Sequence, residues 1–287
     1  MKTALIAVAA LAGLATAAMA APKARPAASP ATPAAPGPAD WRIPDPNDVL
    51  VIDTNKGRIL VEMIPEVAPQ TVARIRELTR AHFYDGLRFF RVIDDFMAQT
   101  GDPQNNGTGG SDKPNVPGEF TFRRGAETPF VLVADQTVAE VGFIKSLPVT
   151  SQSMSLAAMT KDQKVAGWAL YCPGVAGMAR DENPDSNNSQ FFLMRRSHHN
   201  LEKRYTAFGR VIAGEDVVRA IKTGEPVEPP QDRMERVRLL ADLPTAERPK
   251  IRVIDPRSAW FKAQAARAEQ ASPNDFMCDL EIPAEVK

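Results

Sequence analysis

Two polar side chains stand in apolar surroundings within the segment RFFRVIDDFMAQTGD, residues 88–102. Side chains alternate along a strand, so Phe89, Arg91 and Ile93 are expected to share one face. Arg91 and the later Gln99 therefore offer hydrogen-bond donors next to apolar neighbours. The simplest alternative is that Arg91 is a surface residue whose aliphatic stem covers Phe89.

A second segment, GMARDENPDSNNSQFFLM at 177–194, places Gln190 directly before two phenylalanines. The two segments together would line an apolar groove with a few directed donors, which is how binding sites are usually built. Ordinary core burial is the alternative for the apolar members of such a groove. Those members are Phe96, Met97, Phe192 and Leu201.

The motifs of several common chemistries are absent from the sequence. It contains no Gly-x-Ser-x-Gly, no His-Glu-x-x-His and no Gly-x-x-x-x-Gly-Lys-Ser/Thr motif. The only histidines are His82, His198 and His199, and adjacent side chains point apart on an extended backbone. No metal or cofactor is therefore expected, which leaves non-covalent catalysis or plain binding.

Short strands separated by turns must position these residues. VLVID (49–53) and RILVEMI (58–64) predict a hairpin, and Pro69 begins a helix whose apolar residues recur at a spacing of three. Many short strands and only two helices favour an antiparallel barrel or sandwich. The other predicted elements are strands at 87–93, 96–100, 189–195, 205–213 and 236–243, a helix at 214–222, and strands in FVLVA and KVAGWALYC.

The N-terminus is typical of an exported protein. A positive start, an apolar run at 4–18 and Ala18-Met19-Ala20 predict a signal peptide, 1–20, cleaved after Ala20. A membrane anchor is the alternative, but the run is shorter than the roughly 20 residues that span a bilayer. Export, in a bacterium to the periplasm, is expected. The Ala/Pro-rich segment 21–46 is predicted to be an extended linker outside the fold.

The net charge limits the possible functions, and the two cysteines bear on how the C-terminal tail is attached. The formal net charge is zero, so the sequence has no electrostatic footprint for nucleic acid. Cys172 and Cys278 either form a disulfide that pins the tail to the core or are two separate buried thiols. The alternation around Cys278 predicts a half-buried strand at 276–282.

Several motifs in register resemble the cyclophilins, the cyclosporin-binding family of peptidyl-prolyl isomerases. The resemblance covers about residues 48–243, while 112–176 matches poorly and is longer than usual. We therefore divide the folded chain into an isomerase domain at 47–243, with an insertion at about 112–176, and a tail at 244–287 docked on it. The matching motifs are F-x-R-x-I-x-x-F-M-x-Q-x-G-D at 89–102, N-G-T-G-G at 106–110, S-Q-F-F at 189–192 and F-G-x-V at 208–211.

The resemblance implies a closed eight-stranded antiparallel barrel, mostly β, capped by two helices, with the active groove on its outer surface. It implies that Arg91 is the catalytic arginine and that Gln99 holds the substrate backbone. Ala179 and Arg180 would bind the residues before the proline, and Gln190 would support the groove. The proline pocket would be formed by Phe96, Met97, Phe192 and Leu201.

The sequence departs from the family pattern at the pocket. Asn200 stands where the family has a tryptophan, and Tyr205 aligns with the family's pocket histidine. Losing an indole removes an N–H donor and much apolar area, so weak cyclosporin binding is expected. We expect a peptidyl-prolyl isomerase that acts on proline-containing unfolded or folding polypeptides. The alternative is a chaperone or peptide-binding module that uses the same groove with little turnover.

Overall fold

The structure is a computed structural model that describes residues 35–136, 139–272 and 276–287. The predicted signal peptide and the first part of the predicted linker lie outside these residues. Within the described ranges, no helix is long and apolar enough to cross a membrane.

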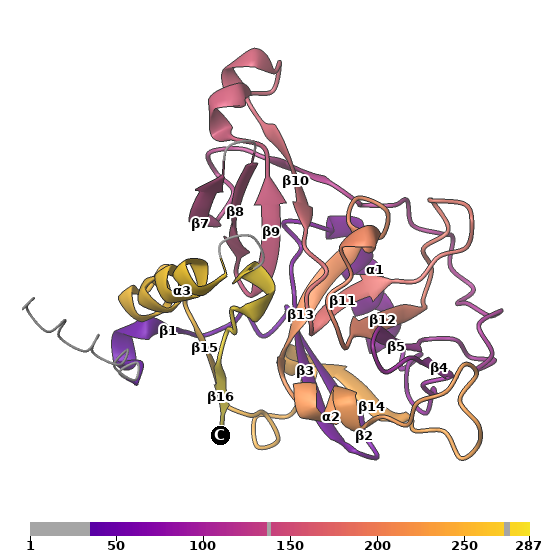
Figure 1. The fold of residues 1–287 in the computed structure, drawn as a ribbon. Helices are drawn as coiled ribbons and strands as arrows, with labels where there is room; N and C mark the ends of the chain where they lie inside the picture. The colour runs from indigo at the N-terminus through magenta and orange to yellow at the C-terminus, as the bar shows by residue number, and fades with distance from the viewer. Residues whose placement is uncertain (1–34, 137–138, 273–275) are drawn as a thin grey trace, which may run out of the picture. The chain divides into compact units, whose positions relative to one another are not determined.

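An antiparallel eight-stranded sheet carries most of the predicted isomerase domain (Figure 1). Its strand order is β14-β2-β3-β13-β11-β12-β5-β4, and the mostly β architecture predicted from the sequence is confirmed. The strands are β2 (Val49–Thr54), β3 (Gly57–Met63), β4 (Arg91–Val92), β5 (Met97–Thr100), β11 (Val175–Met178), β12 (Phe191–Met194), β13 (Ala207–Ala213) and β14 (Met234–Leu239).

The sheet curls into a half-barrel, and the predicted closed barrel is not found. β14 and β4 form the two edges. β4 has only two residues, which is too short for a continuous ladder along that edge. Isolated bridges take its place on this side, and they pair Arg88 with Arg233 and Val92 with Gly224.

Both predicted helices are present. Helix α1 (Pro69–Arg80) begins with proline at its first position, where the missing N–H costs nothing, and buries Val72, Ile75 and Leu78 as predicted. Helix α2 (Glu215–Ala220) follows β13. The remaining short helical turns near this sheet are η3 (His199–Leu201) and η4 (Leu240–Asp242).

The β2 strand is buried on both of its faces. Leu50 and Ile52 pack with Val72 of α1 in one apolar cluster. Val49 and Val51 point the other way and belong to a second cluster, which is built with residues of the insertion and the tail. Burial on both sides explains the continuous apolar run of β2, because an exposed face would have required alternating polar residues.

The insertion forms a five-stranded antiparallel sheet of its own, with the order β6-β10-β9-β8-β7. The sequence predicted only two of its strands. The insertion ends before Val175, which already belongs to β11. Its elements are β6 (Phe122–Arg124), β7 (Phe130–Gln136), β8 (Ala139–Ile144), β9 (Leu147–Ser151), the 3-10 helix η2 (Met154–Met159) and β10 (Val165–Ala169).

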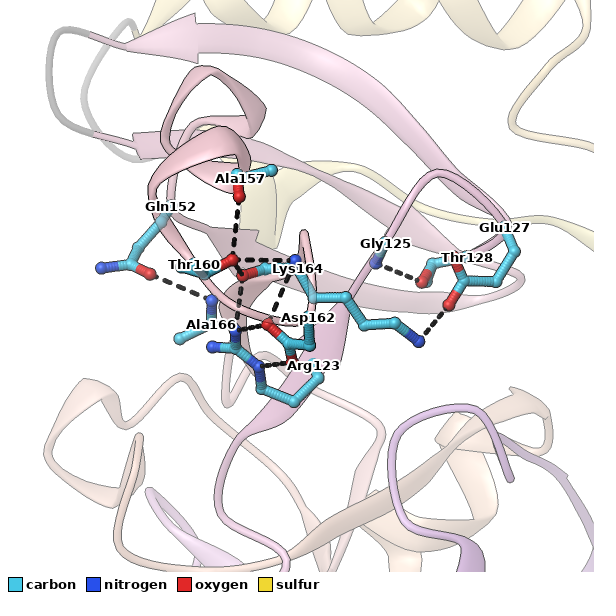
Figure 2. A network of polar contacts seen from close by, with 10 residues as sticks. All are labelled: Arg123, Gly125, Glu127, Thr128, Gln152, Ala157, Thr160, Asp162, Lys164 and Ala166. Atoms are coloured by element: carbon cyan, nitrogen blue, oxygen red, sulfur yellow. Dashed lines mark hydrogen bonds and ion pairs between the residues drawn. The ribbon is translucent and has the colours of Figure 1, made fainter.

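A network of polar contacts holds the far end of this insertion together (Figure 2). The Arg123 guanidinium donates to both carboxylate oxygens of Asp162, at 2.9 and 2.6 Å, and to the Lys164 carbonyl at 2.5 Å. The Lys164 ammonium in turn pairs with Glu127. The turn after η2 is thereby tied to β6, although most of these groups are exposed and each pair adds little stability by itself.

The two ends of the described chain form a third, three-stranded sheet, which corrects two predictions. Trp41 and Arg42 lie in the predicted linker but pair with Ile254 and Val253 of the tail. Arg252 of the tail stacks 4.4 Å from the Trp41 ring centre, and Arg42 also bonds Glu62 of β3 at 2.5 Å. The strand predicted at 276–282 is instead a 3-10 helix followed by irregular chain. The elements are η1 (Pro38–Asp40), β1 (Trp41–Arg42), β15 (Ile251–Ile254), α3 (Ala259–Ala271), η5 (Phe276–Asp279) and β16 (Ala284–Val286).

A disulfide joins Cys172 to Cys278, so the structure decides between the two alternatives left open by the sequence. Cys172 is fully buried and lies three residues before β11. The bond therefore links the tail to the chain that enters the eight-stranded sheet.

Reducing this disulfide is expected to lower the free energy of unfolding by about 2 to 5 kcal/mol. The cysteines are 106 residues apart, so the bond removes a large amount of conformational freedom from the unfolded chain. Urea denaturation with and without reductant measures the effect. A Cys172→Ala/Cys278→Ala double variant serves as the control and should not respond to reductant. Equal midpoints for the oxidised and reduced wild type would contradict the expectation.

Asp102 organises the glycine-rich loop that follows β5. Its buried carboxylate accepts hydrogen bonds from the backbone amides of Gln104 at 2.7 Å, Asn106 at 3.0 Å and Gly107 at 2.6 Å. Burial disfavours the charged form, but these amide donors outweigh burial and hold the pKa of Asp102 below its ordinary value. The loop thus depends on an ionised aspartate.

As the pH is lowered, the free energy of unfolding of the wild type is expected to fall more steeply than that of an Asp102→Asn variant. A depressed pKa contributes stability above the ordinary aspartate value of 3.8, and this contribution is lost as the pH falls through the lower folded-state pKa. Asp102→Asn should be less stable at neutral pH and should show a flatter acid limb in urea denaturation. Asp112→Asn removes an exposed charge nearby and serves as the control. Parallel acid limbs for wild type and Asp102→Asn would refute this role.

Candidate active site

Strand register places three of the predicted site residues, Arg91, Gln99 and Phe192, in one row across the sheet. Arg91 of β4 lies opposite Gln99 of β5, which lies opposite Phe192 of β12, which lies opposite Gly177 of β11. Residues directly opposite one another in a sheet project to the same side. The row therefore brings together side chains that are far apart in the sequence.

Gly177 makes room for the aromatic member of this row. A Cβ at this position would lie 2.6 Å from the Phe192 ring, closer than real contacts allow. The Phe192 ring can therefore fold down over β11. Tyr171 packs behind it, with 6.1 Å between the ring centres, and burial raises the pKa of the Tyr171 phenol, which stays neutral. The base of the site is thus apolar and closely packed.

The Arg91 guanidinium is held by two acceptors. Its Nε donates to the Glu225 carboxylate at 2.5 Å, and its Nη1 approaches the side-chain oxygen of Gln99 at 3.4 Å. The guanidinium also lies 5.9 Å from the ring centre of Phe96. About a third of the side chain, 36%, remains exposed, so the charge faces the groove and not the core.

A chain of amide hydrogen bonds sets the orientation of Gln99. The Gln190 side-chain nitrogen donates to the carbonyls of Gly107 at 3.1 Å and Gly109 at 2.7 Å. Its oxygen must then face Gln99, whose nitrogen donates to it at 3.0 Å. The Gln99 oxygen is thereby left to face Arg91. The glycine-rich loop, through Gln190, fixes which end of the Gln99 amide points into the groove.

One cavity of about 190 Å³ gathers nine of the ten predicted site residues. Met97, Phe192 and Leu201 are almost completely buried in its wall, whereas Phe96 and Tyr205 are partly exposed. Its lining consists of Arg91, Phe96, Met97, Gln99, Ala179, Arg180, Phe192, Leu201 and Tyr205. The cavity is an apolar socket with a guanidinium and an amide at its side.

The tenth predicted residue, Gln190, lines a second cavity of about 450 Å³. Gln99, Ala179 and Arg180 border both cavities, so the two form one continuous groove. The second cavity is more polar, because backbone and amide groups of the glycine-rich loop surround it. Its other lining residues are Gly107, Thr108, Gly109, Gly110, Asn115, Asp181, Ser186 and Asn188.

Three residues near the site were not predicted from the sequence. Glu225 pairs with Arg91 across 134 residues of chain, His198 packs 4.5 Å from Phe96 between ring centres, and Phe120 lies beside Arg180. No local pattern marks any of them, because each reaches the site through the fold. Among the residues that the structure describes, no group of three or more His, Cys, Asp or Glu side chains could hold a metal ion.

Comparisons with known proteins indicate the family of this chain. The family model of cyclophilin-type peptidyl-prolyl cis-trans isomerases matches residues 49–240. A probable peptidyl-prolyl cis-trans isomerase of Brucella suis biovar 1 (strain 1330) is 32% identical over 195 residues, 64% of this chain and 76% of that protein. Peptidyl-prolyl cis-trans isomerase 10 of Caenorhabditis elegans is 29% identical over 174 residues, 61% of this chain and 81% of that protein.

The crystal structure of cyclophilin AquaCyp293 from Hirschia baltica is similar over a longer range. It has a TM-score of 0.80 and 33% sequence identity, and the match covers 87% of this chain and 94% of that one. The structural similarity thus extends beyond the part of the chain that matches the family model. The matched residues, the shared fold and the groove together establish that this chain belongs to the cyclophilin-type peptidyl-prolyl cis-trans isomerase family.

Proposed function

We propose that this isomerase accelerates rotation about X–Pro bonds in exported proteins by stabilising the transition state through Arg91, without a covalent intermediate. The observation that carries the proposal is the placement of the Arg91 guanidinium beside an apolar socket in one cavity. The proposed clients are proline-containing polypeptides that are unfolded or still folding. No cofactor takes part in the proposed step.

The barrier to X–Pro rotation explains why a single donor is useful. Rotation crosses a barrier of about 20 kcal/mol because the amide loses its resonance when it twists. The proline nitrogen regains a lone pair in the twisted state, so a donor aimed at it binds the transition state more tightly than the planar ground state. One charge-assisted hydrogen bond is worth about 1.5–3 kcal/mol, or roughly ten- to a hundredfold in rate.

The contacts of Arg91 leave a donor for this purpose. Glu225 occupies Nε and Gln99 lies near Nη1, whereas Nη2 makes no hydrogen bond within the described part of the chain. These two contacts orient the planar Arg91 guanidinium before substrate arrives, which lowers the entropic cost of ordering this side chain on binding. Under the proposal, Nη2 meets the proline nitrogen during rotation.

The remaining groove residues would hold the substrate on either side of this donor. The proline ring would occupy the socket formed by Phe96, Met97, Phe192, Leu201 and Tyr205. Gln99 would hold the substrate backbone, with Gln190 supporting it. The residues before the proline would lie along Ala179 and Arg180.

Export is part of the proposal and rests on two observations. Residues 1–20 have the charge, apolar run and small-residue cleavage site of a signal peptide. The paired cysteines also suit an oxidising compartment such as the bacterial periplasm, because disulfides rarely persist in the cytosol.

A chaperone or peptide-binding module with little turnover is the second candidate. It is favoured by the exposed apolar residues on η2 of the insertion, Leu156 at 41% and Met159 at 83% exposed. Such residues suit contacts with unfolded chains. Asn200, which stands where the family has a tryptophan, also reduces the apolar area offered to the proline.

Arg91→Ala is expected to lower kcat/KM for a proline peptide about ten- to a hundredfold, because the donor to the twisted nitrogen is lost. Arg91→Lys keeps the charge but loses the planar fork, so it should also lose most turnover. A peptide isomerisation assay measures the rates, and peptide binding measured in parallel separates catalysis from holding. Arg88→Lys, an exposed arginine of the same segment, is the control. Near-normal turnover of Arg91→Ala would reject the role of Arg91, whereas equally slow rates for the wild type and Arg91→Ala with peptide binding retained would favour the chaperone.

Cyclosporin is expected to bind weakly, with a dissociation constant in the micromolar range or above. Asn200 lies exposed on η3 beside Leu201 and offers neither the indole N–H nor its apolar area. Isothermal titration of the purified chain measures the affinity, and Asn200→Trp should tighten it. A nanomolar constant for the wild type would contradict this expectation.

A further inference from the structure

Arg180 occupies the point where the two cavities of the groove meet, and its side chain borders both. It follows β11 after a single intervening residue, Ala179. A side chain at this junction would touch any polypeptide that runs from the apolar socket into the polar cavity.

The fold holds the Arg180 guanidinium in place without a carboxylate partner. Nε donates to the carbonyl of Arg204 at 3.0 Å, and Nη1 donates to the carbonyl of Asp181 at 2.7 Å. The group lies 4.5 Å from the ring centre of Tyr205 and 5.7 Å from that of Phe120. Guanidinium planes stack favourably on aromatic rings. Because the side chain is already ordered, a ligand would not have to order it.

Only one of the two arginines that line the groove has a carboxylate partner. Arg91 and Arg180 are the cations of the two linings, and Asp181 is their one acidic member. Arg91 has the Glu225 carboxylate at 2.5 Å, and the Asp181 carboxylate accepts the Asn183 amide at 2.7 Å. Throughout the described ranges Arg180 makes no ion pair, and its Nη2 makes no hydrogen bond. One fixed positive charge at the junction is therefore without a counterion.

We propose that Arg180 gives the isomerase a preference for substrates with a carboxylate side chain, Asp or Glu, at one of the two positions before the proline. This inference rests on the proposed function, which lays the residues before the proline along Ala179 and Arg180. A substrate carboxylate would supply the missing counterion and bond Nη2 with a charge-assisted hydrogen bond. A lysine or arginine in the same place would be repelled, so the Arg180 charge would favour acidic substrates and disfavour basic ones.

Tetrapeptides that differ only before the proline test the preference with the full chain. Glu, Gln and Lys are placed in turn at the first and at the second position before the proline, and kcat/KM is measured for each. We expect the Glu peptide to exceed the Gln peptide about three- to fivefold at low salt at one of these positions, with Lys below Gln. The ratio should shrink at about 0.5 M salt, since the contact is partly exposed.

Two arginine variants decide whether the preference comes from a direct contact. Arg180→Gln should bring the Glu/Gln ratio close to one, whatever it does to the rate common to all peptides. Arg204→Gln removes the same charge from an exposed neighbour that lines neither cavity, and it should keep the ratio. The Glu peptide should lose its advantage through KM, because the carboxylate contact exists in both ground and transition states.

Several results would overturn the inference. They are equal rates for the Glu, Gln and Lys peptides in the wild type, a ratio that survives Arg180→Gln, or a ratio that Arg204→Gln removes equally. Failure of the proposed function looks different: no peptide would be accelerated, or Arg91→Ala would turn over normally. An enzyme that depends on Arg91 but ignores substrate charge would refute this inference alone.

Discussion

The pairing of β5 with β12 determines where the site can exist. In this register Gln99 lies opposite Phe192 and Met97 opposite Met194, so the polar and apolar halves of the groove share one face. A slip by one residue would turn these side chains into the core and bring core residues outward. Gly101 protects the register at the end of β5, because a Cβ there would lie 2.4 Å from the Ser189 carbonyl. The glycine-rich loop, the amide chain and the socket all depend on this ladder.

The two guanidinium groups that line the groove are chemically identical, but they differ in their hydrogen-bond partners and therefore in how far their charge is balanced. Arg91 is tied to a carboxylate, so its charge is largely balanced and its fork is oriented. Arg180 is tied only to carbonyls and aromatic rings, so its orientation is fixed while its charge is kept. A balanced arginine suits a directional donor, whereas an unbalanced one suits recognition of an anion. Composition alone could not have separated these two proposed roles.

Local patterns predicted much of the fold, and contacts made at long range explain what they missed. The hairpin β2–β3 and helix α1 follow from turn residues and periodicity over a few positions, and the structure has both. The linker boundary was wrong because Trp41 and Arg42 gain order only from partners on the tail and on β3. The alternation around Cys278 indicated a strand, but residues 276–279 form a 3-10 helix that buries Phe276 and Met277 and is bonded to Cys172 through Cys278. Glu225 could not be predicted from local sequence patterns, because its contact with Arg91 is made only in the folded chain.

The insertion and the tail connect to the groove through the chain around β11. The disulfide fixes Cys172, three residues before β11, and Arg180 lies two residues after the strand ends. β11 therefore lies between a residue that is covalently bonded to the tail and the groove residue Arg180. Lys203, between Leu201 and Tyr205 of the groove, also lies 3.6 Å from the ring centre of Trp168 in β10. The added sheets therefore act as supports for one wall of the groove, and the apolar residues at the far end of the insertion stay free for other contacts.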